Sequence, residues 1–295
     1  MRVFHDAAYN DTGLTIETTR KATEIARSLI DRPIDRVEIV SPAVCRRDEI
    51  EAVHAPSYVD AVFTGRPRSL AASNTIGWDD RLAGAVCAST GGVRDATLQA
   101  LATGGVAGSL SSGLHHASWA SGSGYCTFNG LVVAAHAALA AGARRVLVLD
   151  LDAHCGGGTA GLIDGLDGVE QVDVSVSPFD RYESRPDARL VLCDGSNYLE
   201  VVERELAAIT APDEIDLVLY NAGMDPHGLA GGDPDIDDDV LLAREHLVFG
   251  WAASHRLPTA WVLAGGYTHG LTMAELVDLH RITIRAAASV HAVSA

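Results

Sequence analysis

The sequence predicts an α/β fold in which a largely parallel central sheet carries helices on both faces. Of its 295 residues, 47% are hydrophobic and 21% are charged. This composition suits a large globular core and excludes disordered, collagen-like and coiled-coil proteins. Short apolar or β-branched runs alternate with longer helix-like segments along most of the chain, as in parallel sheets. We find no internal repeat and no linker, so we expect a single domain over residues 1–295.

The expected strands are short runs, several of them almost wholly apolar, as is typical of parallel strands that are covered on both faces. They lie at 37–40, 106–110, 145–150, 171–175, 216–220 and 259–263. The helix-like segments are long and rich in Ala, Leu and Glu. They lie at 81–103, 129–141, 197–209, 238–255 and 271–289. Two loop-like stretches, 179–187 and 228–239, are expected at the surface near a functional site.

Charge and cysteine content narrow the class of protein. Lys and Arg total 22 against 39 for Asp and Glu, which gives a net charge of −17 without a basic cluster. This balance argues against binding to nucleic acids or to anionic membranes. The five cysteines form no C-x-x-C pair, which suits a reducing compartment. Since no signal peptide or membrane-spanning run is visible, we expect a cytoplasmic protein.

The clearest candidate site follows the strand at 145–150, where an apolar run ends in Asp150, Asp152 and His154. Side chains alternate along a strand, so these three would share one side if the strand continued. Buried carboxylates need a compensating cation, and a metal ion is the simplest one. The alternative is a strand end at which the aspartates hydrogen-bond to the backbone.

Asp225 follows the strand at 216–220 and could supply a third metal ligand. Three protein ligands with one open position describe a catalytic zinc site, whereas structural zinc sites are closed and usually rich in cysteine. The alternative is a turn residue that precedes Pro226.

Two further candidate groups follow other strands. His115 and His116 come after 106–110, and Tyr267 comes after 259–263. Histidine is the commonest general base near neutral pH. Taken alone, the histidines could also be loop residues and the tyrosine a core residue with a satisfied hydroxyl.

Taken in chain order, these segments resemble the histone deacetylase superfamily, which includes the acetylpolyamine amidohydrolases. The segments that carry the resemblance are 53–58, 115–116, 123–129, 150–154, 222–225 and 265–267. Several ordered motifs at domain-scale spacing are a far more specific signal than any one of them. The resemblance implies an arginase/deacetylase-like fold and a metal-dependent amide hydrolase.

The same resemblance implies a role for each candidate residue. A zinc ion would be held by Asp152, His154 and Asp225. His116 would act as general base and then as general acid, while Tyr267 would hydrogen-bond the oxyanion. Amide hydrolysis needs an activated water, a stabilised oxyanion and a proton for the departing amine, which these groups supply.

Supporting roles are implied as well. His115 would be partnered by Asp150, and Arg20 would match an arginine of the acetate-release channel. Substrate would be bound by Tyr125, Gly124, Gly265 and Gly266. A structural potassium ion is expected near Asp150, Asp152, His154 and Ser175.

Two glycines depart from the family pattern. Gly157 stands where the family has an aspartate, so the carboxylate that would orient His116 is expected to be missing. Its loss would lower the pKa of the histidine and loosen its geometry. Gly156 stands where arginases have a further aspartate that bridges two manganese ions, which favours one metal over two. The loop at 179–186 also differs, so the rim that selects substrate is expected to differ too.

The leading hypothesis is a zinc-dependent deacylase that removes a short acyl group from an acylated polyamine, a small metabolite or an acyl-lysine. The competing hypothesis is a binding protein that keeps zinc and the acyl tunnel but has lost turnover, which Gly157 motivates. Two carboxylates and one imidazole also suit Fe(II), so the metal stays open. The sequence leaves the oligomeric state open as well.

Overall fold

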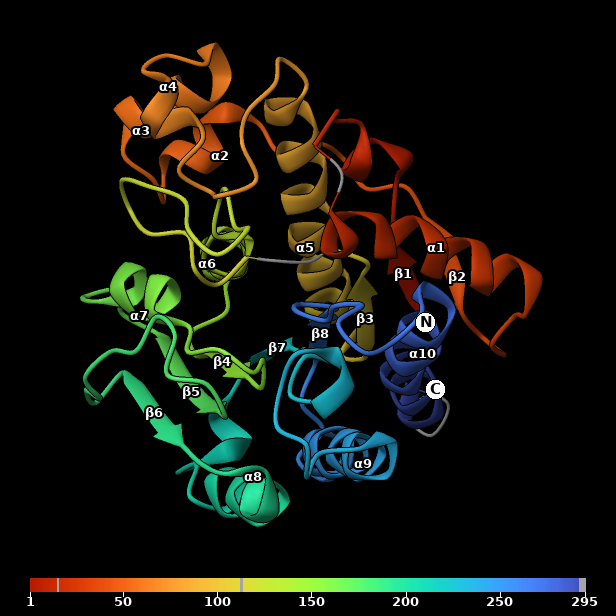
Figure 1. Cartoon of the computed structure of the whole chain (residues 1–295). Helices are drawn as coiled ribbons and strands as arrows, with labels where there is room; N and C mark the ends of the chain where they lie inside the picture. Colours follow the sequence, from red (N-terminus) through yellow and green to blue (C-terminus); the bar gives the residue numbers. More distant parts are fainter. Residues whose placement is uncertain (15, 112–113, 292–295) are drawn as a thin grey trace.

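A computed structural model of the chain contains eight strands, among the residues that it describes, in one parallel sheet (Figure 1). It describes all residues except 15, 112–113 and 292–295. The strands are β1 (Arg2–Phe4), β2 (Glu38–Val40), β3 (Val106–Ser109), β4 (Val146–Asp150), β5 (Val169–Ser175), β6 (Ala188–Leu192), β7 (Leu217–Asn221) and β8 (Thr259–Val262). Their order across the sheet is β2-β1-β3-β8-β7-β4-β5-β6.

Helices connect the strands. The α-helices are α1 (Glu17–Asp31), α2 (Arg47–Glu51), α3 (Pro56–Thr64), α4 (Arg68–Ala71), α5 (Leu82–Thr103), α6 (Gly130–Ala140), α7 (Gly157–Ile163), α8 (Tyr198–Ala207), α9 (Asp238–Ser254) and α10 (Met273–His291). Short 3₁₀ turns are η1 (Ala7–Asn10), η2 (Gly195–Asn197), η3 (Pro212–Glu214) and η4 (Gly228–Ala230).

Alternation along the central strands divides the core into two layers. Leu147 and Leu149 of β4 belong to the layer that the sheet forms with α1, α8, α9 and α10. Val146 and Val148 belong to the opposite layer, with α3, α5, α6 and α7. Figure 1 shows these two groups of helices on opposite sides of the sheet. Because both faces are covered, the central strands β4 and β7 are largely apolar up to their last residues, Asp150 and Asn221.

All six expected strands and all five expected helices are present, each within two residues of the expected bounds. The sequence analysis missed β1, which has three residues, and the edge strand β6, which is partly exposed. It also missed α1, the short helices α2–α4, and α7, which begins with two glycines and therefore carries little helical propensity.

The parallel arrangement brings the polar ends of five strands to one edge. The segments that follow β3, β4, β5, β7 and β8 carry the histidine pair, the Asp150–His154 motif, the loop around residue 180, Asp225 and Tyr267. In open parallel sheets, ligands bind at the carboxyl ends of the strands. None of the helices in the described ranges is both long and apolar enough to cross a membrane.

The packing between β3 and β8 gives a test of the sheet. Gly108 pairs with Trp261, and a Cβ at residue 108 would lie 2.1 Å from the buried indole. We expect Gly108→Ala to lower the free energy of unfolding by about 1–3 kcal/mol, since overpacking forces the neighbours to move. Gly250→Ala is the matched control, because a Cβ there meets open space within α9. Thermal unfolding should show the control at or slightly above the wild type, by ~0.5–1 kcal/mol. Equal melting temperatures for the two variants would contradict this packing.

Candidate active site

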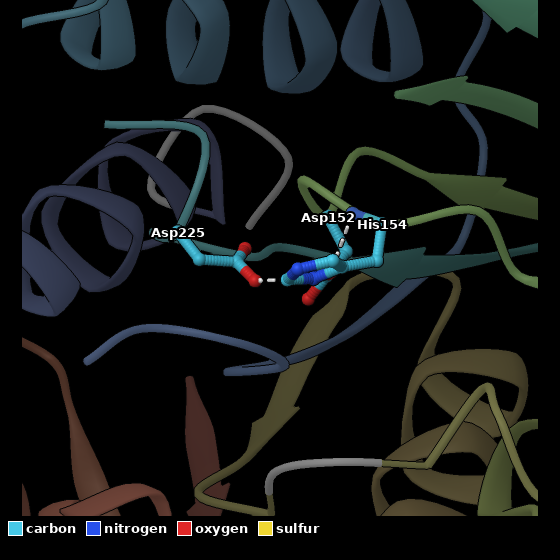
Figure 2. Close-up of side chains that lie close together, drawn as sticks. All are labelled: Asp152, His154 and Asp225. Carbon is cyan, nitrogen blue, oxygen red and sulfur yellow. Dashed lines mark hydrogen bonds and ion pairs between the residues drawn. The ribbon is translucent and has the colours of Figure 1, made fainter. Parts of the chain in front are cut away.

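Two carboxylates and an imidazole converge where β4 and β7 end. Asp152, His154 and Asp225 each offer one ligand atom, and these atoms all lie within 4.8 Å of one another (Figure 2). His154 Nδ1 is 3.1 Å from Asp152 Oδ1 and 3.1 Å from Asp225 Oδ2. Both aspartates are buried, while the histidine is partly exposed. The alternative readings of these residues as isolated cap or turn residues do not explain this convergence.

Backbone amides aim the two carboxylates. Asp152 accepts hydrogen bonds from the N–H groups of His154 (3.0 Å) and Gly265 (2.7 Å). Asp225 Oδ1 accepts one from Ala153 (3.0 Å). The other oxygen of Asp225, Oδ2, is fully buried, and the His154 ring nitrogen lies 3.1 Å from it. Buried carboxylates are costly in a protein unless a positively charged group or a cation compensates them.

The electrostatics also call for a cation. Burial alone would lower the pKa of His154, but hydrogen bonds with Asp152 and Asp225 outweigh burial and raise this pKa to about 11. Burial, followed by the charge of Asp152, raises the pKa of Asp225. The two carboxylates therefore repel each other and draw positive charge between them. A divalent metal ion with two carboxylates and one imidazole fits this donor set.

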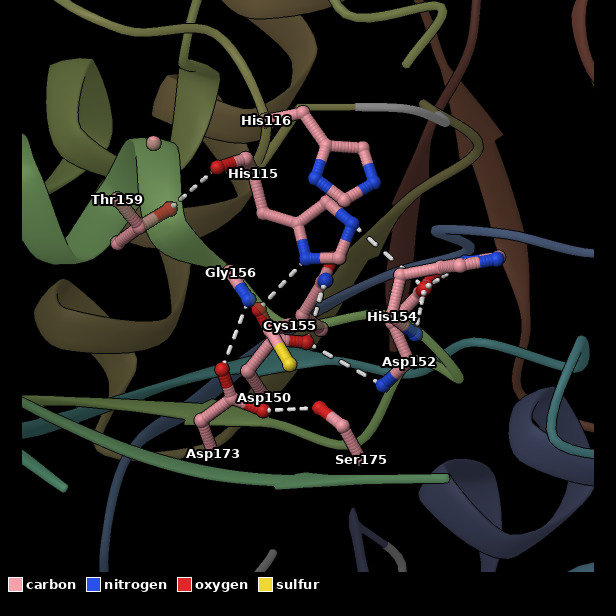
Figure 3. Close-up of polar contacts among 12 residues, drawn as sticks. His115, His116, Asp150, Asp152, His154, Cys155, Gly156, Thr159, Asp173 and Ser175 are labelled. Atoms are coloured by element: carbon pink, nitrogen blue, oxygen red, sulfur yellow. Dashed lines mark hydrogen bonds and ion pairs between the residues drawn. The ribbon is translucent and has the colours of Figure 1, made fainter. Parts of the chain in front are cut away.

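His115 lies beneath the cluster and is clamped by carboxylates. Its Nδ1 is hydrogen-bonded to Asp150 Oδ2 at 2.8 Å, and its Nε2 lies 3.6 Å from Asp152 Oδ1 (Figure 3). Burial would lower the pKa of His115, but the charges of Asp150 and Asp152 outweigh burial and raise it to about 10. Asn221 of β7 donates to the other oxygen of Asp150 at 2.8 Å. The expected pairing of His115 with Asp150 is present.

His116 has a carboxylate partner that the sequence analysis did not find. Its Nδ1 lies 2.9 Å from Asp180 Oδ2, in the loop that follows β5. The expectation that no carboxylate orients His116 is therefore wrong. Gly157 does lack a side chain, but Asp180 reaches the ring from another segment. Burial, and then the charge of His115, lower the pKa of His116, while Asp180 opposes that shift.

Tyr267 reaches the site from the loop after β8. Its backbone N–H donates to Ala230 O at 3.2 Å, which ties this loop to the stretch expected near the site at 228–239. Its ring is mostly buried and stacks on His269 at 5.4 Å between centroids. Burial, together with the charges of Asp225 and Asp152, raises the pKa of its hydroxyl far above the usual value. The hydroxyl thus stays protonated and able to donate.

Two exposed aromatic rings lie beside the candidate catalytic residues, Phe179 next to His116 and Tyr125 next to Tyr267. Tyr125 is 41% exposed and lies 6.1 Å from the Tyr267 ring. Phe179 is 47% exposed, and its ring lies 4.9 Å from His116 and 5.8 Å from His154. Gly124 also lies against His116, since a Cβ there would come within 2.3 Å of the ring. The sequence analysis identified the loop that holds Phe179 but not the ring itself.

The remaining glycines of the predicted site lie behind it. A Cβ at Gly265 would lie 2.0 Å from Asp225 Oδ2, so this glycine packs against the ligand carboxylates. A Cβ at Gly266 would come within 2.8 Å of the buried His280 ring. The structure therefore places Gly265 against the candidate ligands Asp152 and Asp225, and Gly266 against His280.

The loose match of Arg20 to a buried channel arginine is wrong. Arg20 is exposed, whereas its neighbour Lys21 is fully buried. The Lys21 ammonium donates to the carbonyl oxygens of Ala264 and Gly266, in the segment that also packs against the candidate ligand Asp225. Burial lowers the pKa of Lys21 to about 8 despite the charges of Asp225 and Asp152. Arg20 and Lys21 both lie in α1, a helix that the sequence did not predict. Without that helix, its periodicity could not show which of the two side chains faces the core.

A second acidic group lies under the first. Asp173 of β5 is fully buried and accepts hydrogen bonds from the N–H of Gly156 at 2.7 Å and from the hydroxyl of Ser175. Burial, followed by the charge of Asp150, raises the pKa of Asp173 to about 8. A Cβ at Gly156 would lie 2.6 Å from Asp150 Oδ2, so no side chain fits there. Asp173 was missed because it lies inside a strand and not at the polar end that marks the other candidates.

Known proteins are similar to this chain in sequence and in fold. The histone deacetylase domain family matches residues 15–182, more than half of the chain. An uncharacterized protein of Picosynechococcus sp. is 31% identical over 280 residues, which cover 89% of each chain. A probable deacetylase of Methanothermobacter thermautotrophicus is 26% identical over 90% of this chain and 86% of its own. The solved HDA15 HD domain superposes over 100% of this chain and 93% of its own, with a TM-score of 0.76 and 19% identity. This structural likeness confirms the arginase/deacetylase-like fold.

The ligand cluster yields a direct prediction. Asp225→Ala should weaken zinc binding by at least ~10²-fold, because even partners of the ligands are worth 10–100-fold in metal affinity. Asp167→Ala is the matched control, since Asp167 is exposed in the turn before β5. Metal content after gel filtration, measured by plasma mass spectrometry, should fall only in the first variant. Full zinc occupancy in Asp225→Ala would remove Asp225 from the ligand set.

Proposed function

The chain belongs to the histone deacetylase family, and from this premise we propose that it is a zinc-dependent amide hydrolase that removes a short acyl group from an amine. One observation carries the proposal: two buried carboxylates and an imidazole converge, and the exposed ring of Phe179 lies beside that imidazole. A cluster of ionisable groups with shifted pKa values is a common mark of a catalytic site.

We propose that Asp152, His154 and Asp225 hold the metal ion. Three protein ligands leave a position for water or substrate, and a bound zinc ion would polarise the amide carbonyl and acidify water. The support is that the ligand atoms of the three residues all lie within 4.8 Å of one another. Gly156 argues for one ion, since a second would need a carboxylate that glycine lacks. Fe(II) suits the same donors.

His116 is the proposed general base. Its buried ring is held neutral by burial and by the positive charge of His115, so it can accept a proton from water. The hydrogen bond from its Nδ1 to Asp180 directs the free lone pair of Nε2 away from that carboxylate. The same ring can then return the proton to the departing amine.

Tyr267 is the proposed oxyanion donor. Its hydroxyl stays protonated, and its loop is fixed to Ala230, so it can donate to an oxygen that gains charge. Preorganised donors of this type stabilise the transition state more than the ground state. His115, clamped by Asp150 and Asp152, contributes positive charge beneath His116.

We also propose a structural potassium ion at the inner group around Asp150, Asp152, His154 and Ser175. The support is that Asp150 and Asp173 are both buried near one another: burial, and then the charge of Asp150, raise the pKa of Asp173. A monovalent cation among these oxygens would offset that repulsion.

The proposed substrates are acylated polyamines, small acylated amines or acyl-lysines. The net charge of −17 favours cationic amines over nucleic acids or anionic membranes. A cytoplasmic location is proposed with them, which the absence of any disulfide among the five cysteines supports. The competing proposal of a binding protein without turnover rested on an unpartnered His116, and Asp180 removes that reason.

Substitution of the oxyanion donor tests the mechanism. Tyr267→Phe should lower kcat by ~10²–10³-fold, as loss of one oxyanion donor does. KM and zinc content should stay close to those of the wild type, because the hydroxyl is not a metal ligand. Steady-state kinetics together with metal analysis check both points. Unchanged kcat would show that Tyr267 does not stabilise the oxyanion.

A substrate panel tests the function itself. Zinc-loaded protein would be assayed with acetylpolyamines, acetyl-lysine peptides and small acyl amides, with Tyr267→Phe as the inactive control. We expect metal-dependent hydrolysis of at least one class that the control lacks. No hydrolysis across the panel, with zinc still bound, would contradict the proposed deacylase.

A further inference from the structure

The position at which the family carries an aspartate near the catalytic histidine is Gly157, and the structure puts a carboxylate from another loop in that space. We infer that Asp180 is the positioning residue for His116, and that Gly157 is glycine because Asp180 occupies its side-chain space. This inference rests on the proposed function, since His116 needs a fixed orientation only if it transfers protons.

His116 and Gly158 both contact the same oxygen of the Asp180 carboxylate. Its Oδ2 lies 2.9 Å from His116 Nδ1 and accepts a hydrogen bond from the N–H of Gly158 at 3.1 Å. His116 is 5% exposed, whereas the side chain of Asp180 is 28% exposed. A carboxylate at Nδ1 keeps the proton on that nitrogen and leaves Nε2 free to act as the base.

The loop that carries Asp180 is fastened to the segment that carries the metal ligand His154. The N–H groups of Val176 and Ser177 both donate to Ala153 O, at 3.0 and 2.8 Å. The N–H of Cys155 donates to Phe179 O at 3.0 Å. These bonds fix Asp180 independently of His116, so its carboxylate is preorganised rather than drawn in by the histidine.

Residues 157 and 180 exclude each other's side chains. A Cβ at Gly157 would lie 2.3 Å from the carbonyl oxygen of Asp180 and 2.6 Å from its Oδ1. Asp180 has φ +61°, a left-handed conformation that aspartate tolerates better than most residues. The carboxylate can therefore come from position 157 or from position 180, but not from both with this loop in place.

The relocation also joins two functions in one turn. Phe179 lies against the rings of His116 and His154, and the next residue holds His116. The turn that places Phe179 beside His116 and His154 thus also carries the partner of the proposed base. Changes to this loop are expected to alter turnover as well as substrate choice.

Loss of the Asp180 carboxylate tests the inference on the zinc-loaded enzyme. Asp180→Gly should lower kcat by ~10–100-fold with KM and zinc content nearly unchanged, as for loss of an orienting partner. Gly157→Asp alone should be impaired, because it displaces the Asp180 loop. Asp187→Asn, on the same loop, is the matched control and should change kcat less than twofold.

A second readout does not depend on activity. Nitrogen-15 NMR of the histidine side chains, with His116 assigned by its absence in His116→Gln, reports which ring nitrogen carries the proton. We expect the proton on Nδ1 in the wild type and in Asp187→Asn, and its loss from Nδ1 in Asp180→Gly.

The two readouts separate the claims. The inference is overturned if Asp180→Gly keeps kcat within twofold of the wild type, if Gly157→Asp alone keeps the wild-type kcat, or if the His116 tautomer is the same in Asp180→Gly as in the wild type. If no substrate is hydrolysed, the proposed function fails while the tautomer still tests the pairing of Asp180 with His116.

Discussion

The burial of two like-charged carboxylates is the constraint on which the rest of this site depends. Asp152 and Asp225 lie side by side at the ends of β4 and β7, and the His154 ring nitrogen is 3.1 Å from an oxygen of each. Such an arrangement is stable only with positive charge between the carboxylates. Gly265 lets the backbone approach both side chains and donate to Asp152. Further inside, the imidazole of His115 lies between the carboxylates of Asp150 and Asp152, so positive and negative groups again lie side by side.

The partner of His116 shows how a site can keep a geometry while its sequence motif changes. What the chemistry requires is an acceptor at Nδ1 at hydrogen-bonding distance, and the segment that supplies it is not specified. Here β5 ends beside the ligand loop, and a left-handed turn returns a carboxylate to the ring. A sequence motif therefore indicates the role of a residue only when the same segment supplies that residue in every member of the family.

Much of the fold and most of the site could be predicted from the sequence. Buried strands are long apolar runs that end in polar residues, so β4 and β7 and the ligands that follow them were found together. The edge strand β6 and the three-residue β1 carry too little pattern to be recognised. Asp180 was missed because its position depends on a turn conformation and on contacts with a distant segment. Lys21 was missed because α1 was not expected, and burial rather than residue type distinguishes it from Arg20.

The central claim is that one metal ion lies between Asp152, His154 and Asp225. Anomalous diffraction at the zinc edge, from crystals of the zinc-loaded protein, tests this claim most directly. The account predicts one strong peak at ~2.0–2.2 Å from a nitrogen of His154 and an oxygen of each aspartate. Two peaks at this edge of the sheet, or a zinc ion held by other residues, would contradict it.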